Sequence, residues 1–281
     1  MNDSATATAQ PSLSFAEATE WDAVSPNRFR GSVDPGWGHG RSVFGGVVGA
    51  GLVRAMAQDV PDDKLLRSLT VSFVGPVEPA ALECTTEIVR DGKSATFVTG
   101  SVVQDGTKRT IASATFARAR HSTVSVPGPA RPEAPDPDSL PVMPYLEGVM
   151  PRFTQWLDFR YTRGTYPFMG NDTPAIAGWC RFRDDAQPGD AAGMVGLIDA
   201  WPSPALSAYR APAPGSSITW NVDFAGTRPD VRVDEWWYFE AEASFIGEGY
   251  NSFDASLWAP DGQFAARSRQ LAGVFERPPA G

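Results

Sequence analysis

Phe44-Gly-Gly-Val-Val-Gly-Ala-Gly-Leu-Val-Arg-Ala-Met-Ala-Gln58 is the stretch from which the fold can be predicted. Its apolar residues Val48, Leu52 and Met56 recur every four residues, which gives a helix one buried face. A short strand candidate precedes this helix and four strand-like segments follow it, separated by turn dipeptides such as Asp-Gly. This order predicts an α+β unit in which one helix lies on an antiparallel sheet. The predicted strands are residues 29–34, 67–77, 81–90, 94–104 and 110–120.

The second half of the chain repeats this order, with a predicted helix at 191–200. Val71-Ser72-Phe73 matches Val222-Asp223-Phe224, and Thr115-Phe116-Ala117 matches Gln270-Leu271-Ala272. A repeat of this length predicts two copies of one unit. Packed side by side, each copy covers the sheet edge and helix flank that the other leaves open. The predicted strands are residues 153–162, 176–183, 217–224, 236–245, 251–258 and 263–275.

A proline-rich stretch separates the two halves. Because proline fixes φ and lacks an amide donor, neither a helix nor a central strand can run through it. We therefore predict a first unit at residues 13–121, an extended linker at 122–151 and a second unit at 152–277. The prolines are Pro127, Pro129, Pro132, Pro135, Pro137, Pro141, Pro144 and Pro151.

Composition excludes several classes of protein. The 281 residues carry a net charge of −9, which disfavours a nucleic-acid partner. Two cysteines and two histidines exclude a disulfide scaffold and a cysteine-based zinc site, and fit a reducing compartment. No apolar run approaches the roughly 20 residues of a membrane span, and residues 1–14 do not resemble a signal peptide. The expected location is the cytoplasm, with no membrane partner.

The segment from Phe29 to Gly46, with its phenylalanine–double-glycine element, resembles the acyl-CoA thioesterase II family. The second half is similar to that family from Ser217 through Trp236 to Gln270. The resemblance implies two tandem hotdog units, each a sheet wrapped around a central helix, forming a double hotdog. It implies hydrolysis of acyl-CoA, a small-molecule substrate, to free acid and CoA. It implies no metal or redox cofactor, and a homo-oligomer is expected.

Members of the family use an Asp, a Thr or Ser, and a Gln to hold and polarise the attacking water. The resemblance places the Gln at Gln270 and the hydroxyl residue at Ser244, eight residues beyond Trp236. It places the Asp at a position that Thr219 occupies here. This departs from the family pattern, because threonine cannot act as a general base at neutral pH.

Two carboxylates are candidates to replace the missing Asp. Strand alternation predicts that Asp223 shares a face with Thr219 and Asn221. Asp199 belongs to the second predicted helix, where single-hotdog thioesterases often carry their acid. Desolvation against a sheet would raise the pKa of such a carboxyl group and improve it as a base. The alternative for Asp223 is a solvated or arginine-paired side chain, and the alternative for Asp199 is an ordinary helix-face residue near the C-terminal end of its helix.

Thioester hydrolysis also needs donors for the developing oxyanion. The amides of Gly46 and Val47, which open the first helix, are candidates, and Gly45 allows close approach of the thioester. His39 could approach the acyl group from the loop before the helix, or could simply be a solvated loop residue. Gly45 and Gly46 could likewise serve only the tight turn into the helix.

Two other functions stay open. A hotdog hydratase or dehydratase needs a His with an acidic partner, and neither His39 nor His121 lies in such a pattern. A non-catalytic protein that binds acyl-CoA or another apolar ligand would result if the departure at Thr219 has left the site degenerate. The discriminating feature is whether Asp199 or Asp223 lies within hydrogen-bonding reach of Gln270.

Overall fold

The computed structural model describes residues 13–183, 188–225 and 230–276. The described residues of the first half form two α-helices, one 3-10 helix and eight strands. In chain order these are α1 (Phe15–Thr19), β1 (Asp22–Ser25), β2 (Arg28–Ser32), η1 (Pro35–Trp37), β3 (Gly38–His39), β4 (Ser42–Val43), α2 (Gly45–Ala57), β5 (Leu65–Phe73), β6 (Ala81–Asp91), β7 (Ala95–Gln104) and β8 (Thr107–Ala117).

The described second half repeats this order after a connecting segment that contains the short helix η2 (Pro137–Ser139). Its elements are η3 (Arg152–Trp156), β9 (Leu157–Gly164), β10 (Ala175–Phe182), α3 (Ala191–Ile198), η4 (Pro204–Ala208), β11 (Gly215–Phe224), β12 (Trp237–Gly247), β13 (Tyr250–Trp258) and β14 (Phe264–Val274).

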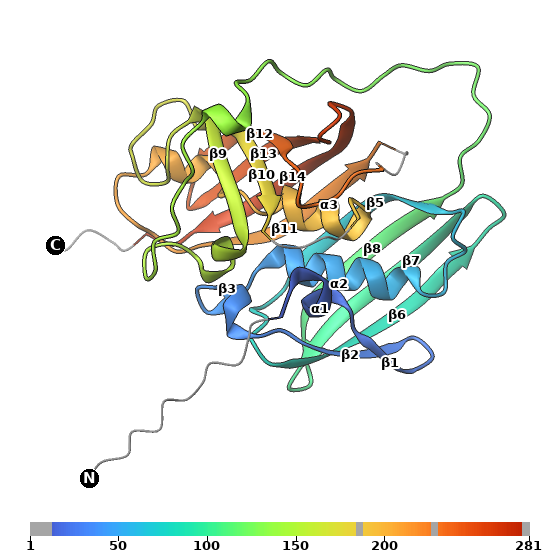
Figure 1. Ribbon diagram of the computed structural model, residues 1–281. Coiled ribbons are helices and arrows are strands. Elements are labelled where there is room, and N and C mark those ends of the chain that lie inside the picture. The colour runs from blue at the N-terminus through green and yellow to red at the C-terminus, as the bar shows by residue number, and fades with distance from the viewer. Residues whose placement is uncertain (1–12, 184–187, 226–229, 277–281) are drawn as a thin grey trace, which may run out of the picture.

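The two halves share one antiparallel sheet of 12 strands, in the order β1-β2-β6-β7-β8-β5-β11-β14-β13-β12-β10-β9. The halves meet where β5 pairs with β11, with Val71 opposite Trp220 and Leu69 opposite Val222. Figure 1 shows the sheet curving around α2 in the first half and around α3 in the second. This is the double hotdog architecture that the repeat predicted.

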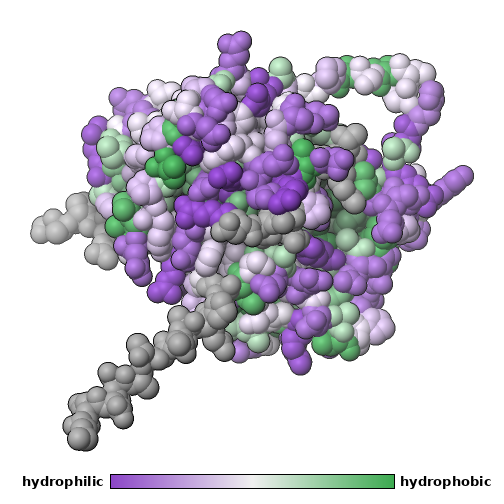
Figure 2. All heavy atoms as spheres, viewed as in Figure 1, coloured by the Kyte–Doolittle hydropathy of each residue, from purple (hydrophilic) through white to green (hydrophobic). Residues whose placement is uncertain are grey.

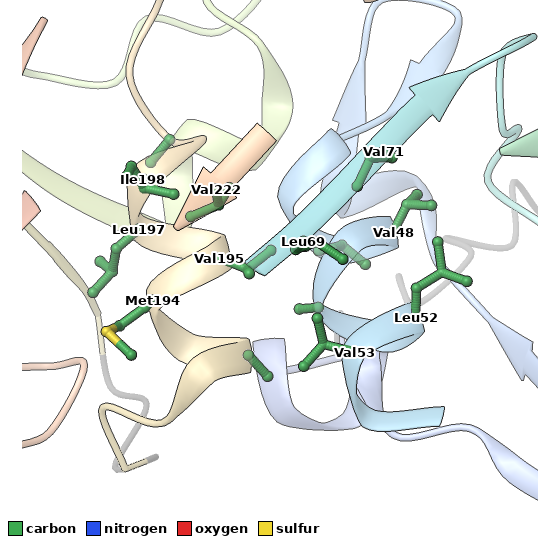
Figure 3. Close-up of a cluster of buried hydrophobic side chains, with 14 of the residues drawn as sticks. Val48, Leu52, Val53, Leu69, Val71, Met194, Val195, Leu197, Ile198 and Val222 are labelled. Carbon is green, nitrogen blue, oxygen red and sulfur yellow. The ribbon is translucent and has the colours of Figure 1, made fainter. Parts of the chain in front are cut away.

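The core lies where the two helices meet. Val48 and Leu52 of α2 and Val195 of α3 are fully buried, as are Leu69 and Val222 on the two central strands. Figure 3 shows these side chains converging from both halves. A Cβ atom on Gly49 would lie 3.0 Å from Cγ1 of Val195, so the small residues of α2 let the helices approach closely. The sheet junction and the helix contact therefore bury one continuous core.

Local sequence explains most boundaries. Asp105 and Gly106 both have positive φ angles, 49° and 70°, as the tight turn of a two-residue hairpin between β7 and β8 requires. Several predictions need correction. The strands predicted at 67–77 and 110–120 already end at Phe73 and Ala117. Phe153 belongs to the 3-10 helix η3 rather than a strand, because its ring stacks on Phe44 at 4.1 Å. The second helix ends at Ile198, which leaves Asp199 as its C-cap.

Helix α1 and the short β3–β4 hairpin were not predicted. Ser14 caps α1, and the side chain of Glu17 reaches back to the Ser14 amide at 2.8 Å. This capping box is a signal that the sequence does carry, as Ser14-Phe-Ala-Glu17. The ring of Phe15 then packs on Phe182, with centroids 4.4 Å apart, so α1 joins the first half to the second.

Residues 118–151 contain no strand and only the helix η2, and residues 118–130 are exposed throughout. Figures 1 and 2 show this chain arching away from the body before it returns to the second half. We call the exposed residues 118–130 the arch. From Pro129 onward the chain lies against the outer side of the sheet. The indole N–H groups of Trp258 and Trp179 donate to the carbonyls of Pro129 and Pro135, both at 2.9 Å. The domain boundaries at 121 and 152 stay predictions, and residue 277 lies outside the described residues.

Candidate active site

Asp199 lies at the junction of the two halves. It follows the last residue of α3, where the negative end of the helix dipole disfavours an anion. Its carboxyl group, however, lies at the N-terminal end of α2, which is the positive end of that helix dipole. There the Gly46 amide donates a hydrogen bond to it. The carboxyl group of the second half therefore reaches the helix terminus of the first half.

Gln270 holds the carboxyl group of Asp199 from the sheet side. It lies on β14, and its side chain is buried and points inward. Its Nε2 donates to Asp199 Oδ1 at 2.9 Å, and its Oε1 accepts a hydrogen bond from the Ser217 hydroxyl at 2.7 Å. An ionised carboxylate can only accept, so the amide must turn its nitrogen toward Asp199. Ser217 fixes that orientation, and the three side chains form one chain of hydrogen bonds.

A β-bulge explains why the sequence did not reveal Ser217. On β11, Ser217 pairs with Ala272 and Thr219 pairs with Leu271, so Ile218 is an extra residue between them. Simple alternation puts Ser217 on the same face as Thr219, but the extra residue turns Ser217 to the inner face instead. The signal available in the sequence was a hydroxyl residue near the start of the strand. The bulge that aims it at Gln270 depends on the tertiary pairing.

The phenylalanine–double-glycine element packs directly against the carboxyl group of Asp199. A Cβ atom on Gly45 would lie 2.8 Å from Asp199 Oδ2, and one on Gly46 would lie 2.4 Å from the Phe44 ring. Phe44 is buried and stacked on Phe153. Glycine at both positions therefore leaves room for the carboxyl group on one side of the turn and for the anchoring ring on the other.

The pKa of Asp199 is raised to about 7. Desolvation by the surrounding protein is the main cause, and the hydrogen bonds from Gln270 and Gly46 oppose it. Asp199 as a whole residue is partly buried. A carboxyl group with this pKa exchanges a proton near neutral pH, as a general base must.

Three residues predicted for the site lie on the outer side of the sheet, away from Asp199 and Gln270. Asp223 is exposed, and Thr219 is on the same outer face of β11. Ser244 on β12 is exposed and donates to Asp254 at 2.8 Å. The structure thus brings Asp199 to Gln270 and leaves these three away from that pair.

The remaining predicted residues surround the start of α2. The Val47 amide donates to the Phe44 carbonyl at 3.2 Å. Gly45 opens the helix, where an N–H group has no acceptor within the helix itself. His39, on the β3–β4 hairpin, is exposed and its ring packs against Phe153, with centroids 5.6 Å apart. His121 is exposed on the arch that follows β8.

The protein is a double hotdog in which a carboxyl group and an amide are held at the junction of the two helices. Comparison with known families shows which hotdog family it belongs to. The sequence matches the family model of the acyl-CoA thioesterase N-terminal domain over residues 33–117. It matches that of the acyl-CoA thioesterase C-terminal domain over residues 130–274. The chain belongs to the acyl-CoA thioesterase family. A search of curated proteins found no match.

Solved structures share the fold over nearly the whole chain. A conserved protein of unknown function with a hotdog fold from Alicyclobacillus acidocaldarius is 25% identical, with a TM-score of 0.83, over 94% of this chain and 98% of that one. The acyl-CoA thioesterase II TesB2 from Mycobacterium marinum is 22% identical, with a TM-score of 0.76, over 95% of this chain and 99% of that one. In the part of the chain that the structure describes, no helix is both long and apolar enough to cross a membrane.

Proposed function

We propose that this protein hydrolyses acyl-CoA thioesters with a water molecule held by Asp199 and Gln270. One observation carries the proposal: Gln270 Nε2 lies 2.9 Å from Asp199 Oδ1 in a site where desolvation raises the pKa of that carboxyl group. The family's Asp, hydroxyl and Gln roles would then fall to Asp199, Ser217 and Gln270. Threonine at position 219 would then not leave the site without a general base, because Asp199 supplies the carboxylate.

The first step is attack by water on the thioester carbonyl carbon. Asp199 accepts one proton of the water, and the oxygen forms a bond to the carbonyl carbon. The second N–H of Gln270 Nε2 would donate to the water oxygen, which would fix the direction of attack. The carbonyl oxygen gains a negative charge, and the product of this step is a tetrahedral intermediate with Asp199 protonated.

The start of α2 is the best place for that negative charge. The Gly45 amide and the positive end of the helix dipole would face the oxyanion. The Gly46 amide already points at Asp199, and the Val47 amide is held by Phe44, so they contribute less. When the intermediate collapses, the C–S bond breaks and the proton on Asp199 passes to the CoA sulfur. The products are a free acid and CoA, and Asp199 is restored.

Release of free thiol from a panel of acyl-CoAs tests the proposal. We expect Asp199→Asn and Gln270→Ala to lower the rate by about a hundredfold or more, because each removes a group that acts on the water. Asp223→Asn is the matched control, since it makes the same change on an exposed carboxyl group on the outer face.

Two outcomes would contradict the proposal. If wild type hydrolyses no acyl-CoA of any chain length, the protein is better described as a binder of acyl-CoA or another apolar ligand. If Asp223→Asn abolishes the rate and Asp199→Asn does not, hydrolysis occurs but the wrong carboxyl group has been assigned.

A further inference from the structure

Phe73 contacts the site from the first half. It is the last residue of β5 and continues the inward-facing series of Leu69 and Val71. Those two residues are fully buried, whereas Phe73 is only partly buried, so its ring lies where the core meets the surface. The next residue, Val74, is 61% exposed. The ring of Phe73 therefore lies at the outer edge of the candidate active site.

The ring and the carboxyl group of Asp199 border the same small space. The point where a Cβ atom would stand on Gly45 is 3.2 Å from Cζ of Phe73 and 2.8 Å from Asp199 Oδ2. Under the proposed function, the thioester carbonyl must approach Gly45 with its carbon next to the water on Asp199. The substituents on the neighbouring acyl carbon must then pass the edge of the Phe73 ring.

We infer that Phe73 restricts the substrate to acyl groups that are unbranched at the carbon next to the carbonyl. The inference rests on the proposed function, and it assigns a specificity role to the half of the chain that holds none of Asp199, Ser217 and Gln270. A methyl branch at that carbon would overlap the ring edge. A straight chain presents only hydrogens there and can lie along the face of the ring.

The test compares two substrates and two variants. We expect wild type to prefer butanoyl-CoA over 2-methylbutanoyl-CoA in kcat/KM, and Phe73→Ala to shift that preference toward the branched substrate by roughly tenfold or more. Phe97→Ala is the matched control, since Phe97 is an exposed phenylalanine on β7, in the same half of the chain. An unchanged preference in Phe73→Ala, or an equal change in Phe97→Ala, would overturn the inference.

A second readout does not need turnover. Among the described residues, the groups whose hydrogen bonds act on the Asp199 carboxyl group are the Gln270 amide and the Gly46 amide. If the Phe73 ring shields this space, its removal admits water and lowers the pKa of Asp199 toward the ordinary range. A carbon-13 NMR titration, assigned with Asp199→Asn, measures this. If wild type fails to hydrolyse any thioester but Phe73→Ala lowers this pKa, the proposed function fails while the shielding stands; an unchanged pKa overturns the shielding.

Discussion

At the scale of single residues, the site combines residues that the sequence indicated with one that it concealed. Gln270 was a candidate because the family resemblance placed the Gln there, and Asp199 because it belongs to the second predicted helix, where single-hotdog thioesterases often carry their acid. Ser217 was not a candidate, because alternation along β11 hides the bulge at Ile218. The pKa of Asp199 is raised, and the cause is a desolvation that only the packed structure reveals.

Asp199 should make the stability of the protein depend on pH. Its pKa rises from 3.8 to about 7 on folding, so the unfolded chain loses this proton at a lower pH than the folded one. Stability from this group is therefore complete below about pH 4 and is lost as the pH rises to about 7. Asp199→Asn cannot ionise, so we expect its melting temperature relative to wild type to be higher at pH 8 than at pH 5. A difference that does not change with pH would show that the pKa of Asp199 is ordinary.

Ser217→Ala should impair turnover without affecting the fold. The loss of its hydroxyl leaves the Gln270 amide free to rotate, because the hydrogen bond to Oε1 at 2.7 Å is gone. We expect kcat to fall about tenfold or more, which corresponds to ~1.4 kcal/mol of transition-state stabilisation. Thiol release measures this, and Ser244→Ala, on the outer face, should remain close to wild type. If Ser244→Ala is the impaired variant, the hydroxyl role lies there instead.

At the scale of elements, regular strands and the first long helix could be predicted, because their signals are local. The Asp105–Gly106 turn and the spacing of Val48, Leu52 and Met56 were sufficient. Phe153 could not be placed from its own sequence, since its 3-10 helix is stabilised by stacking on Phe44 in the other half. The roles of the two glycines also depend on distant partners, Asp199 for Gly45 and the Phe44 ring for Gly46.

Gly45→Ala tests the start of α2 as an element of the site. Alanine favours a helix over glycine by about 1 kcal/mol, so the variant should fold. Its Cβ atom would stand 2.8 Å from Asp199 Oδ2 and would push the carboxyl group away from Gln270. We expect normal thermal stability and a loss of most thiol-release activity. Gly75→Ala is the control, because its Cβ atom would meet Arg109 only at an ordinary 3.5 Å; full activity in Gly45→Ala would refute the close contact.

At the scale of the whole molecule, the site exists because the halves are joined. The β5–β11 pairing and the contact between the helices bring α2 of the first half next to Asp199 of the second. The repeat in the sequence predicted two packed units, and the continuous sheet confirms this arrangement. Alternation and spacing within one half could not predict which residues of the other half would lie next to a given residue. Assembly of further copies stays a prediction.

Cleavage of the arch should leave the molecule intact. Residues 118–130 are exposed, whereas the halves are held together by strand pairing, by the Phe44–Phe153 stack and by the bond from Trp156 to the Gly36 carbonyl. We expect a protease site placed between His121 and Val126 to give two fragments that co-elute and retain thiol-release activity. Size-exclusion chromatography of the cleaved protein measures this, and separated or inactive fragments would mean that the arch itself holds the halves together.

The central claim is that Asp199 acts as the base in acyl-CoA hydrolysis, and the pH dependence of kcat/KM tests it most directly. With Asp199 as base, kcat/KM for an acyl-CoA should rise with pH and level off above an apparent pKa near 7, since only the ionised carboxylate accepts a proton from water. In Asp199→Asn the residual rate should lack this step, while Asp223→Asn should keep it. A step near pH 7 that persists in Asp199→Asn, or a wild-type profile that stays flat from pH 5 to 9, would contradict the account.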